Sequence, residues 1–117
     1  MCQMMITVVE SREFVRIAET LLDDDDREAL IDYLAKYPQS GVLIQGTGGV
    51  RKLRWARRHS GKRGGYRVIY YYHSENIPLF LISMYRKNVK ENLTDAERNA
   101  LASVVKLLVR LSESGNG

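Results

Sequence analysis

Positively charged side chains are concentrated in one part of the chain, and they are the residues best suited to binding or stabilising a phosphate. Residues 38–74 contain eight basic residues and no acidic residue, and six of the eight are arginines. Seven lie between Arg51 and Arg63, and Arg67 follows closely. Arginine presents a planar fork of N–H donors that matches phosphate oxygens. The segment therefore predicts a polyanionic partner, with RNA, DNA, an acidic protein and a merely solvated basic surface all left open.

The rest of the chain differs in charge and has the composition of one folded domain. Residues 1–37 carry nine acidic and four basic residues, a net charge of −5, against +8 for residues 38–74 and +4 for all 117 residues. Hydrophobic residues make up 44% of the chain, as in globular proteins. We expect a single domain over residues 1–117 with a frayed tail at 112–117. Cys2 is the only cysteine, which excludes a disulfide framework.

Several other classes of protein and site are disfavoured. No apolar run approaches the ~20 residues of a membrane helix, and the first residues lack the pattern of a secretory signal, so we expect a cytoplasmic protein without membrane contact. The acids at 23–26 are interpreted as a helix start rather than a metal site. No His, Asp and Glu cluster has metal-ligand spacing, so we expect neither metal nor cofactor. Catalysis by His59 and His73 is the less favoured alternative.

Two helices should follow a short N-terminal strand. Residues 4–9 are apolar and β-branched, which is typical of a strand. Ser11 is suited to cap a helix, whose apolar face is spaced by three and four residues. A second helix should end at Pro38, and the two should pack as an antiparallel hairpin. The faces comprise Phe14, Ile17, Ala18, Leu21 and Leu22 in the first helix and Leu30, Tyr33, Leu34 and Tyr37 in the second.

The second half of the chain should form a β-hairpin, a buried strand and a helix. Residues 50–57 alternate, so Leu53 and Trp55 should face one side and Lys52 and Arg54 the other. Residues 66–73 are aromatic and β-branched, with Arg67 and Tyr71 on one face, and the apolar run 79–85 predicts a central strand. Thr94 and Glu97 form a capping box. The helix behind it should cover the sheet with Leu101, Val104, Leu108 and Leu111.

The expected order is therefore β-α-α-β-β-β-α. This order predicts an α+β fold in which a small, mostly antiparallel sheet carries an N-terminal helical hairpin and a C-terminal helix. The glycines of the segment 41–49 should permit a tight loop, because the Lys-Ser/Thr of a phosphate-binding loop does not follow them.

The ordered combination of these segments resembles a known group of proteins. The chain contains VRKLRWARRHSGKRGGYRVIYYYH and then IPLFLISMYRKNVKENLT. With the preceding helical hairpin, these segments resemble the RelE/ParE toxin superfamily, most closely the HigB-type RelE-like toxins of bacterial type II toxin–antitoxin systems. The resemblance covers nearly the whole chain. It implies a toxin that cleaves mRNA on the ribosome without a metal, as an endoribonuclease in which the 2′-hydroxyl attacks the adjacent phosphate.

The resemblance also implies which residues form the site. The basic-Leu-Arg run assigns Lys52 and Arg54 to catalysis, the Gly-Tyr-Arg-Val-Ile-Tyr run assigns Arg67, and the residues after the last strand assign Lys87. A late tyrosine of the best-known members corresponds to a place near Leu93 here, so Tyr71 or Tyr85 is the candidate for stacking on a base, and Tyr71 is favoured because it shares the face of Arg67. The remaining basic residues are assigned to RNA docking, namely Arg51, Arg57, Arg58, Lys62, Arg63 and Arg86.

The chemistry of such a cleavage can be matched to these side chains. Attack by the 2′-hydroxyl needs in-line geometry, stabilisation of the charged phosphorane and proton transfer. Cations aimed at the phosphate supply the stabilisation, provided that the hairpin brings Lys52, Arg54 and Arg67 onto one face. Nearby like charges lower the pKa of a lysine, so Lys52 is the expected general base. The alternative is that Lys52 only contacts the phosphate.

Two other functions fit the same resemblance. A ParE-like inhibitor of DNA gyrase would share the fold without nuclease chemistry, and a non-catalytic RNA-binding module would share the basic surface. Lys52, Arg54 and Arg67 favour the nuclease, because a gyrase inhibitor needs no such cluster. The resemblance further implies a cognate antitoxin, HigA-like with a helix-turn-helix domain, beside the ribosome and mRNA as partners.

Overall fold

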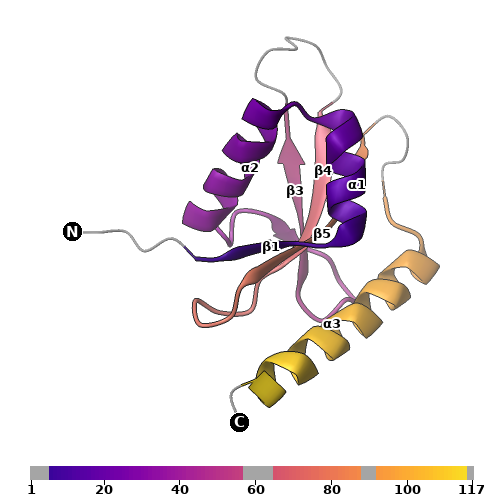
Figure 1. Ribbon diagram of the computed structural model, residues 1–117. Coiled ribbons are helices and arrows are strands. Elements are labelled where there is room, and N and C mark those ends of the chain that lie inside the picture. The colour runs from indigo at the N-terminus through magenta and orange to yellow at the C-terminus, as the bar shows by residue number, and fades with distance from the viewer. Residues whose placement is uncertain (1–5, 57–64, 88–91, 116–117) are drawn as a thin grey trace.

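Three helices and five strands occur in the described part of the chain. The computed structural model describes residues 6–56, 65–87 and 92–115, with side chains up to residue 111. The expected order is confirmed, with one additional two-residue strand before the β-hairpin. In chain order the elements are β1 (Val8–Glu10), α1 (Arg12–Leu21), α2 (Asp24–Lys36), β2 (Val42–Leu43), β3 (Val50–Trp55), β4 (Tyr66–Tyr71), β5 (Leu79–Arg86) and α3 (Asp95–Gly115) (Figure 1).

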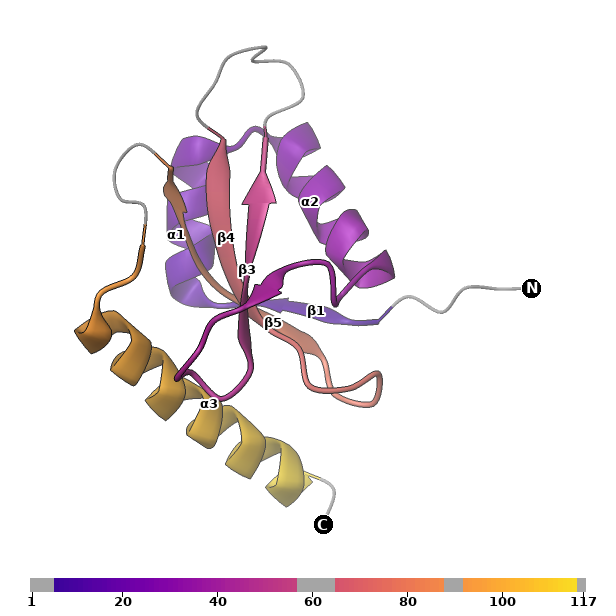
Figure 2. The ribbon, with the colours of Figure 1, turned by 180° about the vertical axis from the view of Figure 1, so that it is seen from behind.

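The strands form one mixed sheet with helices on both faces. The strand order is β1-β5-β4-β3-β2, in which β1 pairs with β5 in parallel and the other neighbours are antiparallel. The hairpin α1–α2 lies on one face, and α3 lies on the other side of the sheet, below its centre in the view shown (Figures 1 and 2). This arrangement confirms the expected α+β class.

Polar side chains begin both N-terminal helices as the sequence predicts. Ser11 Oγ accepts a hydrogen bond from the Phe14 N–H at 3.0 Å. Asp23 Oδ1 accepts one from the Asp26 N–H at 2.8 Å, and the acids that follow occupy the first turn of α2. The acidic run is therefore a helix start, where carboxylates also complement the helix dipole.

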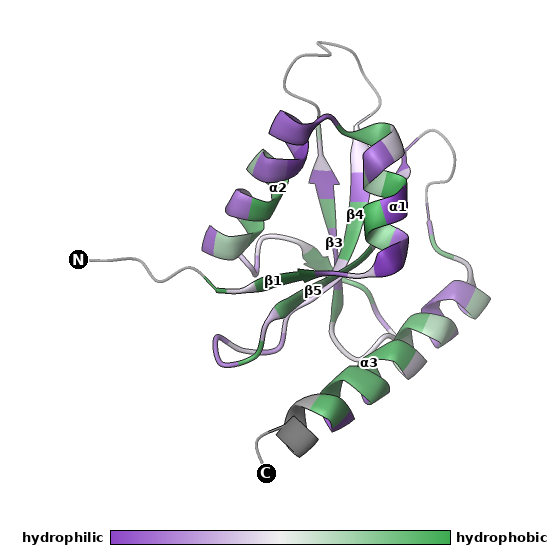
Figure 3. Ribbon diagram, in the orientation of Figure 1, coloured by the Kyte–Doolittle hydropathy of each residue, from purple (hydrophilic) through white to green (hydrophobic). Residues whose placement is uncertain are grey.

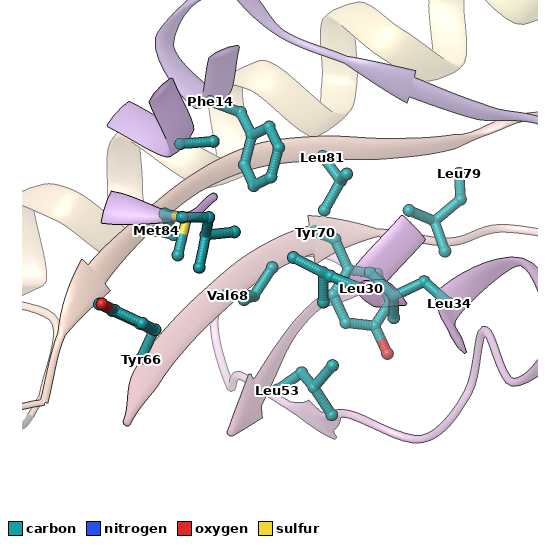
Figure 4. Packing of buried hydrophobic residues seen from close by; sticks show 12 residues of the cluster. Phe14, Leu30, Leu34, Leu53, Tyr66, Val68, Tyr70, Leu79, Leu81 and Met84 are labelled. Carbon is teal, nitrogen blue, oxygen red and sulfur yellow. The ribbon is translucent and has the colours of Figure 1, made fainter. Parts of the chain in front are cut away.

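The main core lies between the sheet and the helical hairpin. Phe14 of α1 and Leu30 and Leu34 of α2 are fully buried against the sheet residues Val68 and Tyr70 (Figure 4). Two aromatic residues of the expected face of α2 differ from prediction, since 36% of Tyr33 and 50% of Tyr37 remain exposed. Their rings pack on each other at 5.2 Å, and the Tyr33 ring also lies 5.7 Å from that of Trp55 in β3, while Leu30 and Leu34 fill the buried contact with the sheet.

The contact of α3 is narrower than its apolar stripe. The capping box is confirmed. Thr94 Oγ1 accepts a hydrogen bond from the Glu97 N–H, and a Glu97 carboxylate oxygen accepts one from the Thr94 N–H. Among the described side chains of α3, Val105 is the buried one, with Leu101 and Leu108 partly buried beside it. The prediction was wrong for two stripe residues, because Val104 and Leu111 lie 37% and 59% exposed.

The placement of α3 explains this difference. α3 runs obliquely across the base of the sheet, and the sheet covers only one seam of the helix although hydrophobic residues occur on successive turns (Figure 3). Even α3, the longest described helix, is not apolar enough to cross a membrane.

The glycine-rich loop between β2 and β3 has a structural role. Gly46, Gly48 and Gly49 adopt positive φ angles, which favour glycine. Thr47 is fully buried between them, and its hydroxyl donates to the Ile44 carbonyl at 2.6 Å and accepts from the Val50 N–H at 3.1 Å. The loop is thereby closed tightly enough to start β3 in a defined position.

Candidate functional site

Basic side chains from two neighbouring strands share one face of the sheet. Arg54 of β3 lies directly opposite Arg67 of β4, and Arg67 lies opposite Tyr85 of β5. Lys52 precedes Arg54 by two residues, so it projects from the same face. Directly opposite residues have Cβ atoms about 4.5–5.5 Å apart. We call Lys52, Arg54 and Arg67 the basic cluster.

The alternation of the strands holds the basic cluster on this face. Leu53 and Val68 lie opposite each other and are buried against the helical hairpin, as is Tyr66. Because neighbouring residues of a strand point to opposite faces, burial of these side chains directs Arg54 and Arg67 the other way. A slip of one residue would move the apolar set out of the core, so the register is strongly specified.

Buried contacts at both ends of the β3–β4 hairpin also fix its position. The Tyr70 hydroxyl donates to the Pro38 carbonyl and accepts from the Gly41 N–H, both at 2.8 Å. Gly65 comes so close to β3 that a Cβ atom would lie 2.7 Å from the Trp55 carbonyl oxygen. Tyr70 therefore ties β4 to the segment before β2, and Gly65 sets the close approach of β4 to β3.

The basic cluster lacks internal charge compensation. No carboxylate of the described residues lies within ion-pair distance of Lys52, Arg54 or Arg67, whereas Arg27 pairs with Glu10 at 2.9 Å elsewhere. Arg67 Nη1 is buried and has no hydrogen-bond partner among the residues that the structure describes. Like charges that face each other across strands are destabilising, and an unsatisfied buried donor is costly. A bound anion would relieve both costs.

The surface around the cluster is open to a large ligand. Seen from behind, the upper halves of β3 and β4 have no described helix in front of them, since α3 lies lower (Figure 2). Arg54 is exposed, and Lys52 and Arg67 are half-buried. The arrangement can therefore bind a phosphate of a chain that extends beyond the site.

The two tyrosines expected to stack on a base lie in different environments. Tyr71 is only 3% exposed and packs with Val50, Ile69 and Val105 in the core beneath α3. Burial raises the pKa of the Tyr71 hydroxyl above its ordinary value. Tyr85 is half-buried beside Arg67 and lines a cavity. The structure therefore brings Tyr85, and not Tyr71, to the open surface near the basic cluster.

The remaining basic residues predicted for the site are distributed over both faces. Arg51 lies on the face of β3 that α1 and α2 cover, and its Nη1 donates to the Gln39 and Gly41 carbonyls at 3.1 and 2.8 Å. Arg86 is exposed and projects toward the same side. Lys87 follows the end of β5, and its N–H donates to the Gly65 carbonyl at 3.1 Å, which holds its backbone beside the start of β4.

Four of the predicted docking residues lie outside the described residues, namely Arg57, Arg58, Lys62 and Arg63. His59 lies outside them as well. His73 is exposed just after β4, with its ring 6.4 Å from that of Tyr71. Within residues 6–56, 65–87 and 92–115, no group of three His, Cys, Asp or Glu side chains could hold a metal ion.

Two acidic residues near the site were not anticipated as part of it. A cavity of about 250 Å³ between the sheet and α3 is lined by Tyr85, Leu93, Glu13 and Glu97, among others. The sequence identified Glu97 only through the capping box, which it does serve, and Glu13 lies in the first turn of α1. Their common cavity could not be seen from the sequence because Glu13 and Glu97 belong to helices on opposite sides of the sheet.

Comparison with known proteins agrees with this architecture. The sequence model of the family described as "RelE toxin of RelE / RelB toxin-antitoxin system" matches residues 6–115. Among solved structures, the chain is similar to a mutant of the E. coli toxin RelE in the free state, with a TM-score of 0.53 and 20% sequence identity. The match covers 75% of this chain and 90% of that one. At this identity the structural likeness shows the fold.

Proposed function

Because the chain belongs to the RelE toxin family of toxin–antitoxin systems, we propose that it is a ribosome-dependent endoribonuclease that cleaves mRNA without a metal ion. The attacking group is the 2′-hydroxyl next to the scissile phosphate, so the RNA supplies the nucleophile. The protein must then orient the linkage, stabilise the phosphorane and move the protons.

One observation carries this proposal. Arg54 and Arg67 face each other across neighbouring strands, with Lys52 on the same face and no ion-pairing carboxylate in the described chain. A protein that only needed a stable sheet would gain from an opposite charge at one of these positions. The arrangement suits the binding of a phosphate whose negative charge increases in the transition state.

The residues divide the chemical work as follows. Arg54 and Arg67 bind the scissile phosphate and stabilise the phosphorane, and Lys52 removes the proton of the 2′-hydroxyl. Lys87, two residues after Tyr85, adds a further cation toward the leaving oxygen. Tyr85 packs against a base, since Tyr71 is buried and Leu93 has no aromatic ring.

The partners follow from the family. A RelE toxin has an antitoxin partner, and we propose that the antitoxin here is HigA-like, with a helix-turn-helix domain. This assignment belongs with the HigB-type subclass that the sequence resembles. mRNA and the ribosome are the proposed targets, and the cytoplasm is the proposed place of action.

Translation in vitro tests the proposed activity. The wild-type protein and Lys52→Ala are added to a translation reaction, and the mRNA is analysed by primer extension. We expect codon-spaced cuts with the wild type, and a much larger loss of cleavage than of ribosome binding for Lys52→Ala. Trapped breaks in DNA together with intact mRNA would instead identify a gyrase inhibitor. RNA binding without either effect would identify a non-catalytic module.

A further inference from the structure

An open groove lies between α1 and the end of β5, next to the site but on the other side of the sheet edge. β1 ends opposite Leu81, so in the described chain no strand flanks the last residues of β5 on that side. α1 packs there instead, and both views place the end of β5 beside this helix (Figures 1 and 2). The groove has a volume of about 540 Å³.

The groove combines an apolar floor with a cationic rim. Ile17 and Leu21 of α1 and the buried Met84 of β5 line the floor. Arg16 of α1 and Arg86 of β5 are exposed and line the rim. The described lining contains no carboxylate. An apolar surface accommodates the face of a base, and two arginines match the phosphates on either side of it.

Tyr85 connects this groove to the basic cluster. Tyr85 lines the groove and also the cavity on the opposite face, where it is the cross-strand neighbour of Arg67. A single strand whose scissile phosphate lies at Arg54 and Arg67 can therefore pass Tyr85 and continue around the open edge of β5. The groove begins at Tyr85, on the other side of this edge.

We propose that this groove is a nucleotide subsite for the RNA strand, in which Arg16 and Arg86 bind backbone phosphates next to the cleaved linkage. The inference rests on the proposed function, because it takes the ligand to be RNA. Arg16 and Arg86 are positioning residues here, since they contact the substrate away from the reacting atoms. An acidic segment of a protein partner is the other class of ligand, and the test separates it from RNA.

Binding of a 2′-O-methyl oligoribonucleotide, which cannot undergo attack by its own 2′-hydroxyl, measures the subsite independently of cleavage. The variants are Arg16→Ala and Thr20→Glu, which places a negative charge on the exposed groove side of α1. Their matched controls are Arg12→Ala on the same helix and Asn99→Glu on α3, both exposed and outside the groove. Fluorescence anisotropy over a series of salt concentrations gives the affinity and its salt dependence.

We expect Arg16→Ala to weaken binding roughly fivefold, as for the loss of one exposed ionic contact. The slope of log affinity against log salt should become less steep by about 0.7, because one phosphate contact of a single strand is lost. Thr20→Glu should weaken binding further, and the two controls should bind like the wild type. Binding of Arg16→Ala and Thr20→Glu equal to that of the controls would overturn the subsite, and so would weaker binding with an unchanged salt slope.

Single-turnover cleavage on programmed ribosomes separates the two proposals. If the wild type cleaves and Arg16→Ala matches Arg12→Ala in half-saturating concentration and in RNA affinity, the subsite is wrong and the nuclease stands. If the wild type does not cleave but Arg16→Ala binds RNA more weakly with the expected salt slope, the nuclease is wrong and the subsite stands. Loss of antitoxin binding by Arg16→Ala with unchanged RNA affinity would assign the groove to the protein partner and overturn the proposal.

Discussion

Arg54 and Arg67 lie directly opposite each other on adjacent strands, in the half of the sheet that α3 leaves open. Cross-strand pairs of like charge weaken a sheet, and this pair has no ion-pairing carboxylate in the described segments. The neighbouring apolar pair Leu53 and Val68 secures the same strands from the other face. The face of the β3–β4 hairpin that stabilises the fold is therefore opposite to the face proposed to bind an anion.

Replacing Arg54 separates these two properties. Arg54→Ala should lower the rate of mRNA cleavage by about 100- to 1,000-fold, as for the loss of a group that stabilises transition-state charge. Its melting temperature should be unchanged or higher, since one of two facing like charges is gone. Primer extension and thermal unfolding measure the two effects. Arg98→Ala, which removes an exposed arginine of α3 paired with Asp95, is the control; equal cleavage by the two variants would contradict the assignment.

Lys52→Arg distinguishes proton transfer from phosphate binding. Arginine keeps the positive charge but is not deprotonated in proteins. We expect the half-saturating concentration on programmed ribosomes to remain near that of the wild type while the maximal cleavage rate falls at least 100-fold, within the range of general-base catalysis. Full activity of Lys52→Arg would show that Lys52 only contacts the phosphate and does not transfer a proton.

Tyr70 should make the fold sensitive to alkaline pH. Burial, the largest effect, raises the pKa of Tyr70 above its ordinary value of 10.0, against the opposing effect of the Gly41 hydrogen bond. The folded state favours the neutral phenol, so this contribution is complete below about pH 10 and is lost as pH rises through the folded pKa. Urea unfolding at several pH values should show the free energy of unfolding decreasing above pH ~10.

Tyr70→Phe isolates the contribution of this hydroxyl. The variant loses the bonds to Pro38 and Gly41 and should be less stable by about 1–3 kcal/mol at neutral pH. Its alkaline decrease should be smaller than that of the wild type, with Tyr71 accounting for part of the remainder. Tyr37→Phe is the control, because half of that side chain is exposed. An identical alkaline decrease in Tyr70→Phe and the wild type would show that Tyr70 is not the titrating group.

Gly65→Ala tests the close approach of β3 and β4. The new Cβ atom would meet the Trp55 carbonyl oxygen at 2.7 Å and the Ala56 Cα at 3.3 Å, both of them backbone atoms. We expect a loss of about 1–3 kcal/mol, as for other overpacked positions, together with weaker cleavage because Arg67 lies two residues away. Urea unfolding and primer extension measure both effects. Wild-type stability would mean that the strands can separate at no cost.

The orientation of α3 about its own axis, which decides which of its side chains face the sheet, can be tested with two apolar residues. Val105 is 5% exposed and Leu107 is 52% exposed. Val105→Ala should lower the free energy of unfolding by about 1–3 kcal/mol, whereas Leu107→Ala should change it by less than ~0.5 kcal/mol. Urea unfolding of both variants measures the difference. The reverse ranking would require a different face of α3 to contact the sheet.

Local patterns predict most of this fold, because each pattern has one physical cause. Alternation along residues 50–57 correctly put Leu53 and Trp55 on the face opposite to Lys52 and Arg54, and Ser11 and the acids of α2 mark helix starts by their hydrogen bonds. Alternation also separates Arg51 from Lys52, a signal present in the sequence that grouping by charge overlooked. The row of α3 residues that contacts the sheet could not be predicted, since the periodicity defines an apolar stripe that is wider than this contact.

The register of the β3–β4 hairpin, and with it much of the site, can be derived only from the structure and not from the sequence. Nothing in the sequence states that Arg54 is the partner of Arg67, because this depends on the length of the connection and on the contacts of Tyr70 and Gly65. Arg16 carries no signal either, since a single arginine on an amphipathic helix is common. Only the packing of α1 beside β5 gives this residue a place near the other cations.

The pairing of β1 with β5 joins the first and the last strand of the domain. The Ser11 hydroxyl, which caps α1, also donates to the Ile82 carbonyl at 2.8 Å across 71 positions of sequence. During synthesis, α1 and α2 emerge from the exit tunnel long before β5 exists to support them, and closing so long a loop is slow. Under the proposed function, the growing polypeptide would therefore have no complete catalytic surface, and the ribosome that translates this message would be spared until its product is almost finished.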